Sequence, residues 1–401
     1  MKIIQYAVIG LFVLFPFAQL TRIPLFFSPA IRLYAQDVLV AVIAVTLTVQ
    51  WLRNKNSIKA PPLTNYIALF LLAALISLII NANRYSLNEL AVSSLYLVRW
   101  VVYAAIYIAV YNLLRLHKFQ AFKTEKYLLI AGTVSALFGL IQYFVYPNLR
   151  NLIYLGWDPH EYRIFGTFFD SGYLGLIYVL TLILASSNFT TGTIIIWIVV
   201  YAAFALTYSR SSYLALILSA FVYSCMSKSM KPFLISLALV VPLFFMLPHP
   251  SPTAEGTDLT RTTSAVARLT NIEKSITIIK DNPLFGIGFN TLRYENRDRT
   301  YVPAYEWENN NAAAGFDNSF LFIWATTGII GLAFYSSILI RSMYTAYEKV
   351  KRGNAVRADY LILISLTAIV IHSQFNNSLF YPWIMVWMWI LLAESHVKRL
   401  S

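Results

Sequence analysis

The chain has 401 residues, of which 58% are hydrophobic and only 12% are charged, and its formal net charge is +13. Since a soluble domain carries about 25% charged residues, this composition excludes an ordinary soluble protein and predicts a membrane protein. The single cysteine, Cys225, excludes a disulfide within the chain and a thiolate metal cluster.

Apolar stretches recur along nearly the whole chain. About 20 apolar residues cross the hydrocarbon core of a bilayer, and about twelve such stretches occur here. We therefore predict an all-α, polytopic membrane protein of about twelve transmembrane helices, in a single membrane domain over residues 1–401. We expect the first stretch to be a retained span and not a cleaved signal peptide. The stretches are centred near residues 12, 43, 72, 102, 136, 180, 200, 219, 240, 331, 365 and 386.

The basic residues are distributed asymmetrically between the two sides of the predicted membrane domain. With a cytoplasmic N-terminus, seventeen of the 31 Lys and Arg residues fall inside, six fall in short outside loops and seven fall in one long outside loop. This bias follows the positive-inside rule and predicts that both termini are cytoplasmic. Because topology explains most of the charge, we expect no nucleic-acid partner.

Two ionisable residues lie within predicted spans, Asp37 in the second and Arg99 in the fourth. An ionised side chain in the bilayer is costly unless it is paired. Both positions belong to the outer half of the membrane, so we predict a structural ion pair between them.

Two short outside loops each carry an arginine beside a turn. Arg163 precedes Gly166 in "YRIFGTFFD", and Arg210 occupies the tight turn "TYSRSS" between two spans. One interpretation of Arg210 is an arginine that reaches the lipid headgroups. The other is a fixed cationic site at the outer surface.

The long outside loop covers residues 249–317. It opens with turn-forming and polar residues and continues with an amphipathic pattern in which Leu269, Ile272, Ile276 and Ile279 recur at helical spacing before Pro283. We predict a helix of about four turns, followed by a tight bend at "GIG". Such a long loop is usually functional or disordered, and this pattern favours an ordered lid. Its later aromatic residues are weaker candidates for stacking on sugars: Tyr301, Tyr305 and Trp307.

Arg268, which opens this helix, lies on the same side of the membrane as the other two outer arginines. If Arg163, Arg210 and Arg268 converge, they form a cationic site at the lipid–water boundary. Guanidinium groups bind phosphate oxygens bidentately, so a lipid-linked diphosphate is the expected ligand.

Four segments together resemble the bacterial O-antigen ligase and O-antigen polymerase family, which handles undecaprenyl-diphosphate-linked glycans. They are the arginine segment "YRIFGTFFD", the Ser-Arg-Ser turn "TYSRSSYLAL", the loop segment "ARLTNIEKSITIIKDNPLFGIGFNTL" and the start of the tenth span, "DNSFLFIWATTGIIG". In the last segment Asn318, Gly328 and Gly331 match the family signature, but Asp317 stands where the ligase-like signature has histidine.

This resemblance implies a glycan transfer at the outer face of the inner membrane. Arg163, Arg210 and Arg268 would bind the diphosphate of a polyprenyl-linked donor, and a saccharide acceptor hydroxyl would attack the anomeric carbon with inversion. The resemblance implies no cofactor and no metal. The departure from histidine favours a polymerase of surface polysaccharide, with an O-antigen ligase that uses a lipid A-core type acceptor as the alternative.

Asp317 and His372 are the candidate catalytic residues. Asp317 would orient or deprotonate the acceptor hydroxyl, and it would also suit the N-terminal cap of the tenth span. His372, near the outer end of the eleventh span, either faces the site or is a hydrogen-bonded residue at a helix end.

Two other function classes remain as alternatives. A transporter or flippase of lipid-linked saccharide would more often show paired halves with broken spans, which we do not detect. A non-enzymatic scaffold leaves the outer arginines without a role.

Overall fold

The computed structural model describes residues 1–23, 31–116, 121–187, 190–249, 255–301 and 311–397. Helices make up nearly all of the regular structure in these residues. The one sheet among them is a two-residue antiparallel pair, in which Arg22 of β1 (Arg22–Ile23) is opposite Tyr34 of β2 (Leu33–Tyr34). The predicted all-α fold of a membrane protein is therefore confirmed.

Fifteen α-helices lie in the described part of the chain. Their bounds are α1 (Lys2–Leu14), α2 (Ala35–Arg53), α3 (Thr64–Ile80), α4 (Leu87–Arg115), α5 (Ala121–Val145), α6 (Ser171–Ser186), α7 (Thr191–Ala205), α8 (Arg210–Ser227), α9 (Lys231–Val240), α10 (Leu243–Met246), α11 (Thr263–Asp281), α12 (Leu292–Asp298), α13 (Ser319–Lys351), α14 (Arg357–His372) and α15 (Pro382–His396). The 3-10 helices are η1 (Phe15–Thr21), η2 (Lys55–Ser57), η3 (Ala82–Arg84), η4 (Arg150–Leu155), η5 (Gly166–Phe168), η6 (Glu255–Thr257), η7 (Asn311–Ala314) and η8 (Ser378–Phe380).

Each of the predicted span centres falls within one of these helices. In the described residues, five helical segments are long and apolar enough to cross a membrane individually: Lys2–Thr21, Ala35–Arg53, Leu87–Arg115, Thr124–Val145 and Ser319–Lys351. Four shorter apolar helical segments accompany them. The protein is thus a multi-pass membrane protein, while the number of twelve spans stays a prediction.

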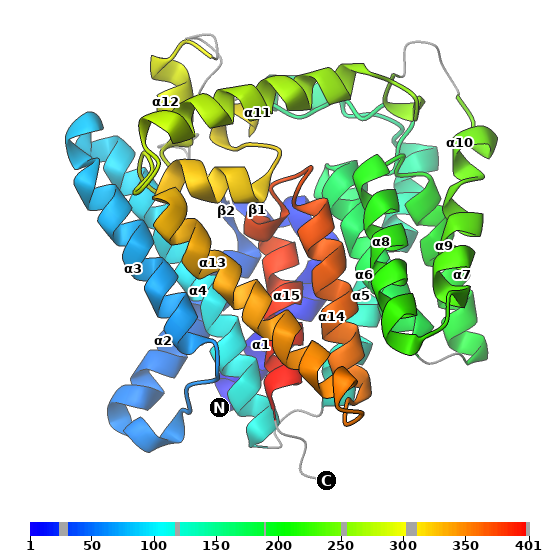
Figure 1. The fold of residues 1–401 in the computed structure, drawn as a ribbon, viewed down its shortest axis with the longest axis horizontal. Coiled ribbons are helices and arrows are strands. Elements are labelled where there is room, and N and C mark those ends of the chain that lie inside the picture. Colours follow the sequence, from blue (N-terminus) through cyan, green and yellow to red (C-terminus); the bar gives the residue numbers. More distant parts are fainter. Residues whose placement is uncertain (24–30, 117–120, 188–189, 250–254, 302–310, 398–401) are drawn as a thin grey trace.

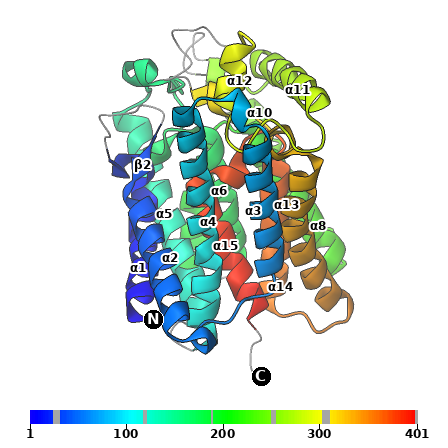
Figure 2. The ribbon, with the colours of Figure 1, turned by 90° about the vertical axis from the view of Figure 1, so that its left-hand side faces the viewer.

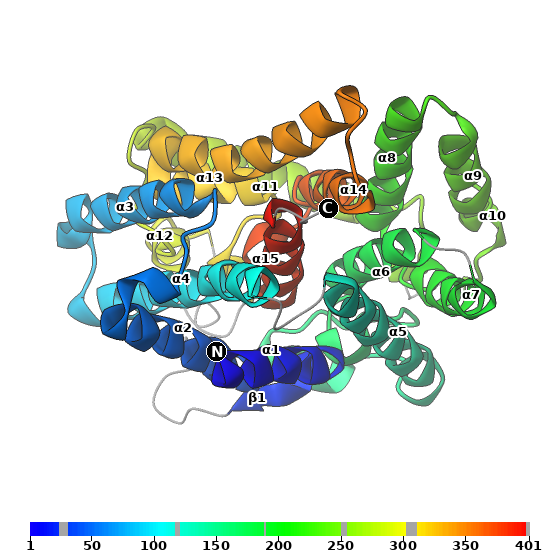
Figure 3. The same ribbon diagram turned by 90° about the horizontal axis from the view of Figure 1, so that it is seen from below.

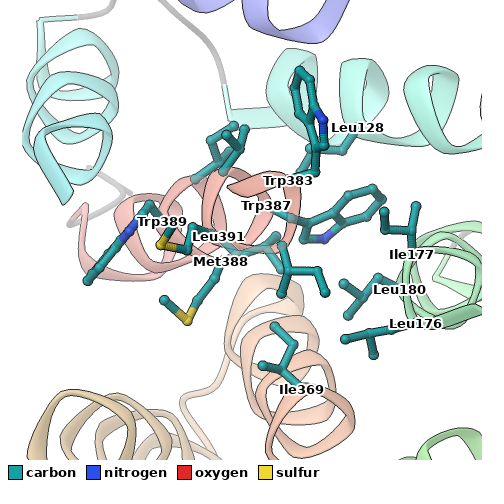
Figure 4. Packing of buried hydrophobic residues seen from close by; sticks show 14 of the residues in the cluster. Leu128, Leu176, Ile177, Leu180, Ile369, Trp383, Trp387, Met388, Trp389 and Leu391 are labelled. Carbon is teal, nitrogen blue, oxygen red and sulfur yellow. The ribbon is translucent and has the colours of Figure 1, made fainter. Parts of the chain in front are cut away.

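Helix α15 forms the centre of the bundle. Seen along the helices in Figure 3, it is surrounded by α1, α4, α6, α13 and α14. Its tryptophans Trp383, Trp387 and Trp389 are at most 2% exposed. Figure 4 shows that Trp387 points toward Ile177 and Leu180 of α6. Because α15 is buried on all sides, its apolar residues show no amphipathic period.

The predicted Asp37–Arg99 pair is confirmed. The Nε and Nη2 atoms of Arg99 donate to the two carboxylate oxygens of Asp37 at 2.9 and 3.0 Å, and the Tyr103 hydroxyl donates to Oδ1 at 2.7 Å. Removing one partner of a buried pair costs about 3–5 kcal/mol, because the other charge is then left without compensation. This pair therefore ties α2 to α4.

Helix α13 is broken at Gly328, where the backbone has φ +70° and ψ −178°. The break frees carbonyl groups of the preceding turn. The amide N–H groups of Ile287 and Gly288 donate to the carbonyls of Ala325 and Thr326 at 2.9 and 3.1 Å, and the N–H of Ile329 donates to the carbonyl of Pro283 at 2.9 Å. The bend after α11 is thus anchored in the break of α13.

Helix α11 lies across the end of the bundle opposite to both termini (Figures 1 and 2). Near its C-terminal end, Ile278 and Ile279 pack with Ile287 and Phe322. The predicted apolar stripe is only partly covered, since Leu269 is 60% exposed and Ile276 is 41% exposed. The helix is held at its C-terminal end, and its first half stands over a pocket.

We predict that Gly328→Ala releases α11. A Cβ at this position would lie 1.9 Å from the Leu284 carbonyl oxygen, and a backbone with φ +70° and ψ −178° adds about 1–3 kcal/mol for an L-residue. We expect a lower Tm in detergent and faster proteolytic cleavage of the 255–301 segment.

Gly353→Ala is the matched control for this prediction. Gly353 also has a positive φ, +72°, but an added Cβ there has no neighbour within 4 Å. In this variant we expect the free energy of unfolding to fall only by the cost of the positive φ, without release of α11. Equal effects of the two substitutions would show that docking at the break is unimportant.

Candidate functional site

A polar pocket of about 600 Å³ lies between the bundle and the segment that leads into α11. Four parts of the chain line it: residues 158–172, which end in the start of α6; residues 208–211 at the start of α8; residues 255–268; and Asn376. The structure brings together here all three arginines selected from the sequence, and it adds a fourth. The four are Arg163, Arg210, Arg261 and Arg268.

Arg163 is held rigidly at the base of the polar pocket, where it is only 8% exposed. Its Nε donates to the carbonyl of Thr207 at 3.0 Å, and the N–H of Ile164 donates to the carbonyl of Leu206 at 2.8 Å. These bonds tie the loop before α6 to the turn before α8. Gly256 covers the side chain so closely that a Cβ there would lie 2.8 Å from Cδ of Arg163.

Arg210 joins the turn before α8 to the start of α11. Its Nη1 donates to the carbonyls of Leu259 and Arg261 at 3.3 and 2.9 Å, and its Nη2 donates to the hydroxyl of Ser264. These acceptors are neutral, so the positive charge of Arg210 is not cancelled. Arg210 therefore fixes the backbone at Arg261 and also presents its own charge to the pocket.

Arg261 and Arg268 approach the pocket from the other side. Nη1 of Arg261 donates to the carbonyls of Gly256 and Asp258, both at 2.7 Å. The Arg268 guanidinium lies 5.7 Å from the centre of the Phe375 ring, close enough for a cation–π contact.

None of these four arginines forms an ion pair with a carboxylate of the described residues. In contrast, Arg297 and Arg299, on the same side of the bundle, are each paired with two acidic residues. Burial lowers the pKa of Arg261 to about 10, and its three arginine neighbours act in the same direction. Burial also lowers the pKa values of Arg163 and Arg268. Four carboxylates, Asp158, Glu161, Asp170 and Glu255, also line the pocket, but none of them lies within ion-pair distance of these arginines. An anion that binds between the guanidinium groups would therefore meet charges that are not engaged in an ion pair with a described residue.

A second pocket, of about 410 Å³, adjoins the first and shares Arg210, Ser211 and Arg268 with it. Its lining is mostly apolar and includes the exposed Leu269. Asp317 lines this second pocket and does not line the polar one.

Asp317 is exposed to this pocket and accepts no hydrogen bond from a described residue. Desolvation by the surrounding protein raises its pKa, although the positive charge of Arg268 acts in the opposite direction. Asp170, whose negative charge also raises this pKa, lines the polar pocket and caps α6, accepting from the N–H groups of Gly172 and Tyr173 at 2.7 and 2.8 Å.

The alternative role of Asp317 as a helix cap is wrong. The side chain of the next residue, Asn318, caps α13 by accepting from the N–H groups of Phe320 and Leu321 at 2.8 and 3.1 Å. Asp317 lies one residue too early in the chain to reach these donors. It is therefore free for another role.

His372 is fully buried at the end of α14 and lines neither pocket. Its Nδ1 lies 2.7 Å from the Ser378 hydroxyl, and its Nε2 lies 3.3 Å from the Asn376 amide nitrogen. That amide donates to the hydroxyl of Ser211 at 3.0 Å. His372 thus reaches the site only through Asn376, which lines the polar pocket.

The remaining candidates lie apart from the two pockets. Tyr301 contacts Lys274, whose Nζ lies 5.0 Å from the ring centre, and it lines neither pocket. Tyr305 and Trp307 lie outside the described residues. The described part of the chain also contains no group of three or more His, Cys, Asp or Glu residues arranged to hold a metal ion.

Arg261 is the functional candidate that the sequence pattern did not identify. It lies in the turn-rich opening of the long loop, where no periodic pattern marks a structured element. The only available signal was that Arg261 precedes Arg268 by seven residues, which is two turns of a helix. This signal would have been misleading, because α11 begins only after Arg261.

The middle of the chain matches a known protein family. The O-antigen ligase family model matches residues 192–336, a segment that contains Arg210, Arg261, Arg268 and Asp317. This match confirms the resemblance found in the sequence. No curated protein matches the chain.

Proposed function

We propose that this protein transfers a glycan from a polyprenyl-diphosphate donor to a sugar hydroxyl. The proposal starts from residues 192–336, which match the O-antigen ligase family of glycan-transferring enzymes. The transfer takes place at the outer face of the inner membrane. This orientation rests on the positive-inside distribution of Lys and Arg, which puts both termini in the cytoplasm and the arginine pocket outside.

The observation that carries the proposal is the convergence of four arginines, none of which forms an ion pair with a described residue, although carboxylates also line the pocket. Bringing like charges together is unfavourable unless an anion binds between them. A diphosphate has oxygens for several bidentate guanidinium contacts, and these contacts need no metal ion. The arrangement therefore suits a diphosphate better than a single carboxylate.

In the proposed reaction, the acceptor oxygen attacks the anomeric carbon while the bond from that carbon to the diphosphate oxygen breaks. The acceptor proton passes to a base, and the electron pair of the broken bond remains on the lipid diphosphate. Negative charge develops on this leaving group, and the fixed arginines stabilise it without having to reorganise.

We assign the base to Asp317. Its oxygens accept no hydrogen bond from a described residue, its pKa is raised, and it lies near Arg268, where the donor would bind. Asp170, in contrast, already accepts two backbone hydrogen bonds as a helix cap. The acceptor would approach from the second pocket, whose apolar lining suits the C–H faces of sugar rings.

We assign His372 a positioning role. Because it is buried behind Asn376, it would orient this amide and the Ser211 hydroxyl beside the arginines. His372 would then act through Asn376 and Ser211 and would not contact the acceptor itself.

The aspartate at position 317 favours a polymerase, because the ligase-like signature has histidine there. The test is the product that purified protein forms from a lipid-diphosphate glycan without nucleotide. A ladder of longer lipid-linked glycans supports a polymerase, and glycan on a lipid A-core type acceptor supports a ligase. Movement of intact donor across a vesicle membrane, with no new glycosidic bond, would instead identify a flippase.

We predict that Arg268→Ala weakens donor binding about 10-fold to 150-fold, since a hydrogen bond to a charged group contributes about 1.5–3 kcal/mol. Arg268→Lys should recover only part of this loss, because lysine lacks the planar fork of arginine. Equilibrium binding of the lipid-diphosphate donor measures both effects.

The matched control for Arg268 is Arg84→Ala. Arg84 is exposed and lines neither pocket, so donor affinity should stay at the wild-type level. If both variants lost donor affinity equally, donor binding would depend on general surface charge and not on the arginine pocket.

We predict that Asp317→Asn lowers turnover by about 10²–10⁴-fold, as expected when a general base is lost, with little change in donor affinity. In the wild type, turnover should fall as the pH drops through the raised pKa of Asp317, because the protonated carboxyl is not a base. This loss begins at a higher pH than for an ordinary aspartate, whose pKa is about 4. Turnover measured against pH checks both statements.

The comparison variant is Asp170→Asn, which removes the other nearby carboxylate while asparagine still caps α6. We expect a smaller loss of turnover. A larger loss in Asp170→Asn than in Asp317→Asn would transfer the role of base to Asp170.

A further inference from the structure

A third cavity, of about 140 Å³, lies apart from the two pockets of the site. It is formed where η1, the segment around β2, the middle of α4 and the start of α15 meet. The lining is cationic and aromatic: it includes Arg32, Tyr34, Tyr96, Arg99, Tyr381 and Trp383.

The two arginines of this cavity differ in their charge balance. Arg99 is neutralised by Asp37, with which it forms two hydrogen bonds. Arg32 forms no ion pair and no hydrogen bond with a described residue, although it is half-buried. Burial lowers the pKa of Arg32, so its charged form is poorly solvated. One uncompensated positive charge therefore remains beside the cavity.

The other lining groups suit a sugar ring. Tyr34, Tyr96 and Trp383 offer aromatic surface, which packs against the C–H faces of saccharides. The polar side chains of Gln19 and Tyr381 also line the cavity, and these two side chains interact with each other.

A stacked aromatic pair joins this cavity to the arginine pocket. The ring of Tyr381 lies 4.0 Å from that of Tyr173, with an angle of 15° between the planes. Tyr173 follows Gly172, which lines the arginine pocket. A glycan that extends past this pair would connect the two sites.

We propose that this third cavity binds a carboxylate-bearing sugar, with its carboxylate on Arg32 and its ring against the aromatic residues. That this sugar is a unit of the transferred or accepting glycan rests on the proposed function. The existence of a binding site in the third cavity does not rest on the proposed function, because that site follows from Arg32 and the aromatic lining alone.

The experiment is ligand-detected NMR titration of the purified full chain with glucuronate, glucose and inorganic phosphate. Each titration is repeated in Arg268→Ala, so that anion binding in the main arginine pocket is separated from binding at Arg32. Glucuronate should bind at least about tenfold more tightly than glucose, and Arg32→Gln should remove this difference. Arg32→Lys should keep part of it.

The matched control is Arg22→Gln. Arg22 lies on β1, opposite Tyr34, but its side chain is exposed and does not line the cavity. Glucuronate affinity in this variant should equal that of the wild type. An equal loss in Arg22→Gln, or unchanged affinity in Arg32→Gln, would overturn the proposal. Phosphate that binds as tightly as glucuronate and depends on Arg32 would indicate an anion or headgroup site and would overturn the assignment to a sugar.

Failure of this proposal is distinguishable from failure of the proposed function. If the protein elongates a lipid-linked glycan but Arg32→Gln leaves glucuronate binding unchanged, only the third site is wrong. If glucuronate binding depends on Arg32 but no glycan is transferred, the cavity site stands and the enzymatic assignment fails.

Discussion

The arrangement of the site depends on the break in α13 at Gly328. An unbroken helix would satisfy its own carbonyl groups and offer nothing to the loop. The break leaves the carbonyls of Ala325 and Thr326 to accept from the bend after α11, and a Cβ at Gly328 would collide with the backbone of that bend. With its C-terminal end anchored there, α11 lies across the end of the bundle, and its Arg268 shares a pocket with Arg210 at the start of α8.

The second determining feature is the charge balance of the arginine pocket. Elsewhere in the described part of the molecule, buried or half-buried cations are commonly neutralised, as Arg99 is by Asp37 and Arg357 is by Glu125. In the pocket, neutral carbonyl and hydroxyl groups orient Arg163, Arg210 and Arg261 without cancelling their charge. Such neutral acceptors fix the direction of each guanidinium while its attraction for an anion remains. The four guanidinium groups thus stay available to an anion, although Asp158, Glu161, Asp170 and Glu255 line the same pocket.

The two candidate catalytic residues show how burial separates roles that residue type alone leaves open. Asp317 lies at the surface of the second pocket and accepts no hydrogen bond from a described residue, whereas His372 is enclosed between Ser378 and Asn376. A histidine is often the better base near neutral pH, but a fully enclosed ring with both nitrogens engaged cannot contact a sugar hydroxyl directly. An exposed carboxylate with a raised pKa is better placed for that contact.

Composition and local pattern were sufficient to determine the all-helical membrane fold, the family resemblance and the Asp37–Arg99 pair. These follow from short-range rules: a bilayer requires apolar helices, and two charges in neighbouring spans require each other. The same rules located three arginines on one side of the membrane. They did not identify Arg261, because it lies in an aperiodic turn and reaches the pocket only through the way the segment before α11 folds. They also could not choose between Asp317 and Asn318 as the cap of α13, since both residue types cap well and a shift of one residue decides which side chain reaches the helix N–H groups. Convergence, burial and the break at Gly328 depend on contacts between residues far apart in the chain, and only the tertiary structure decided them.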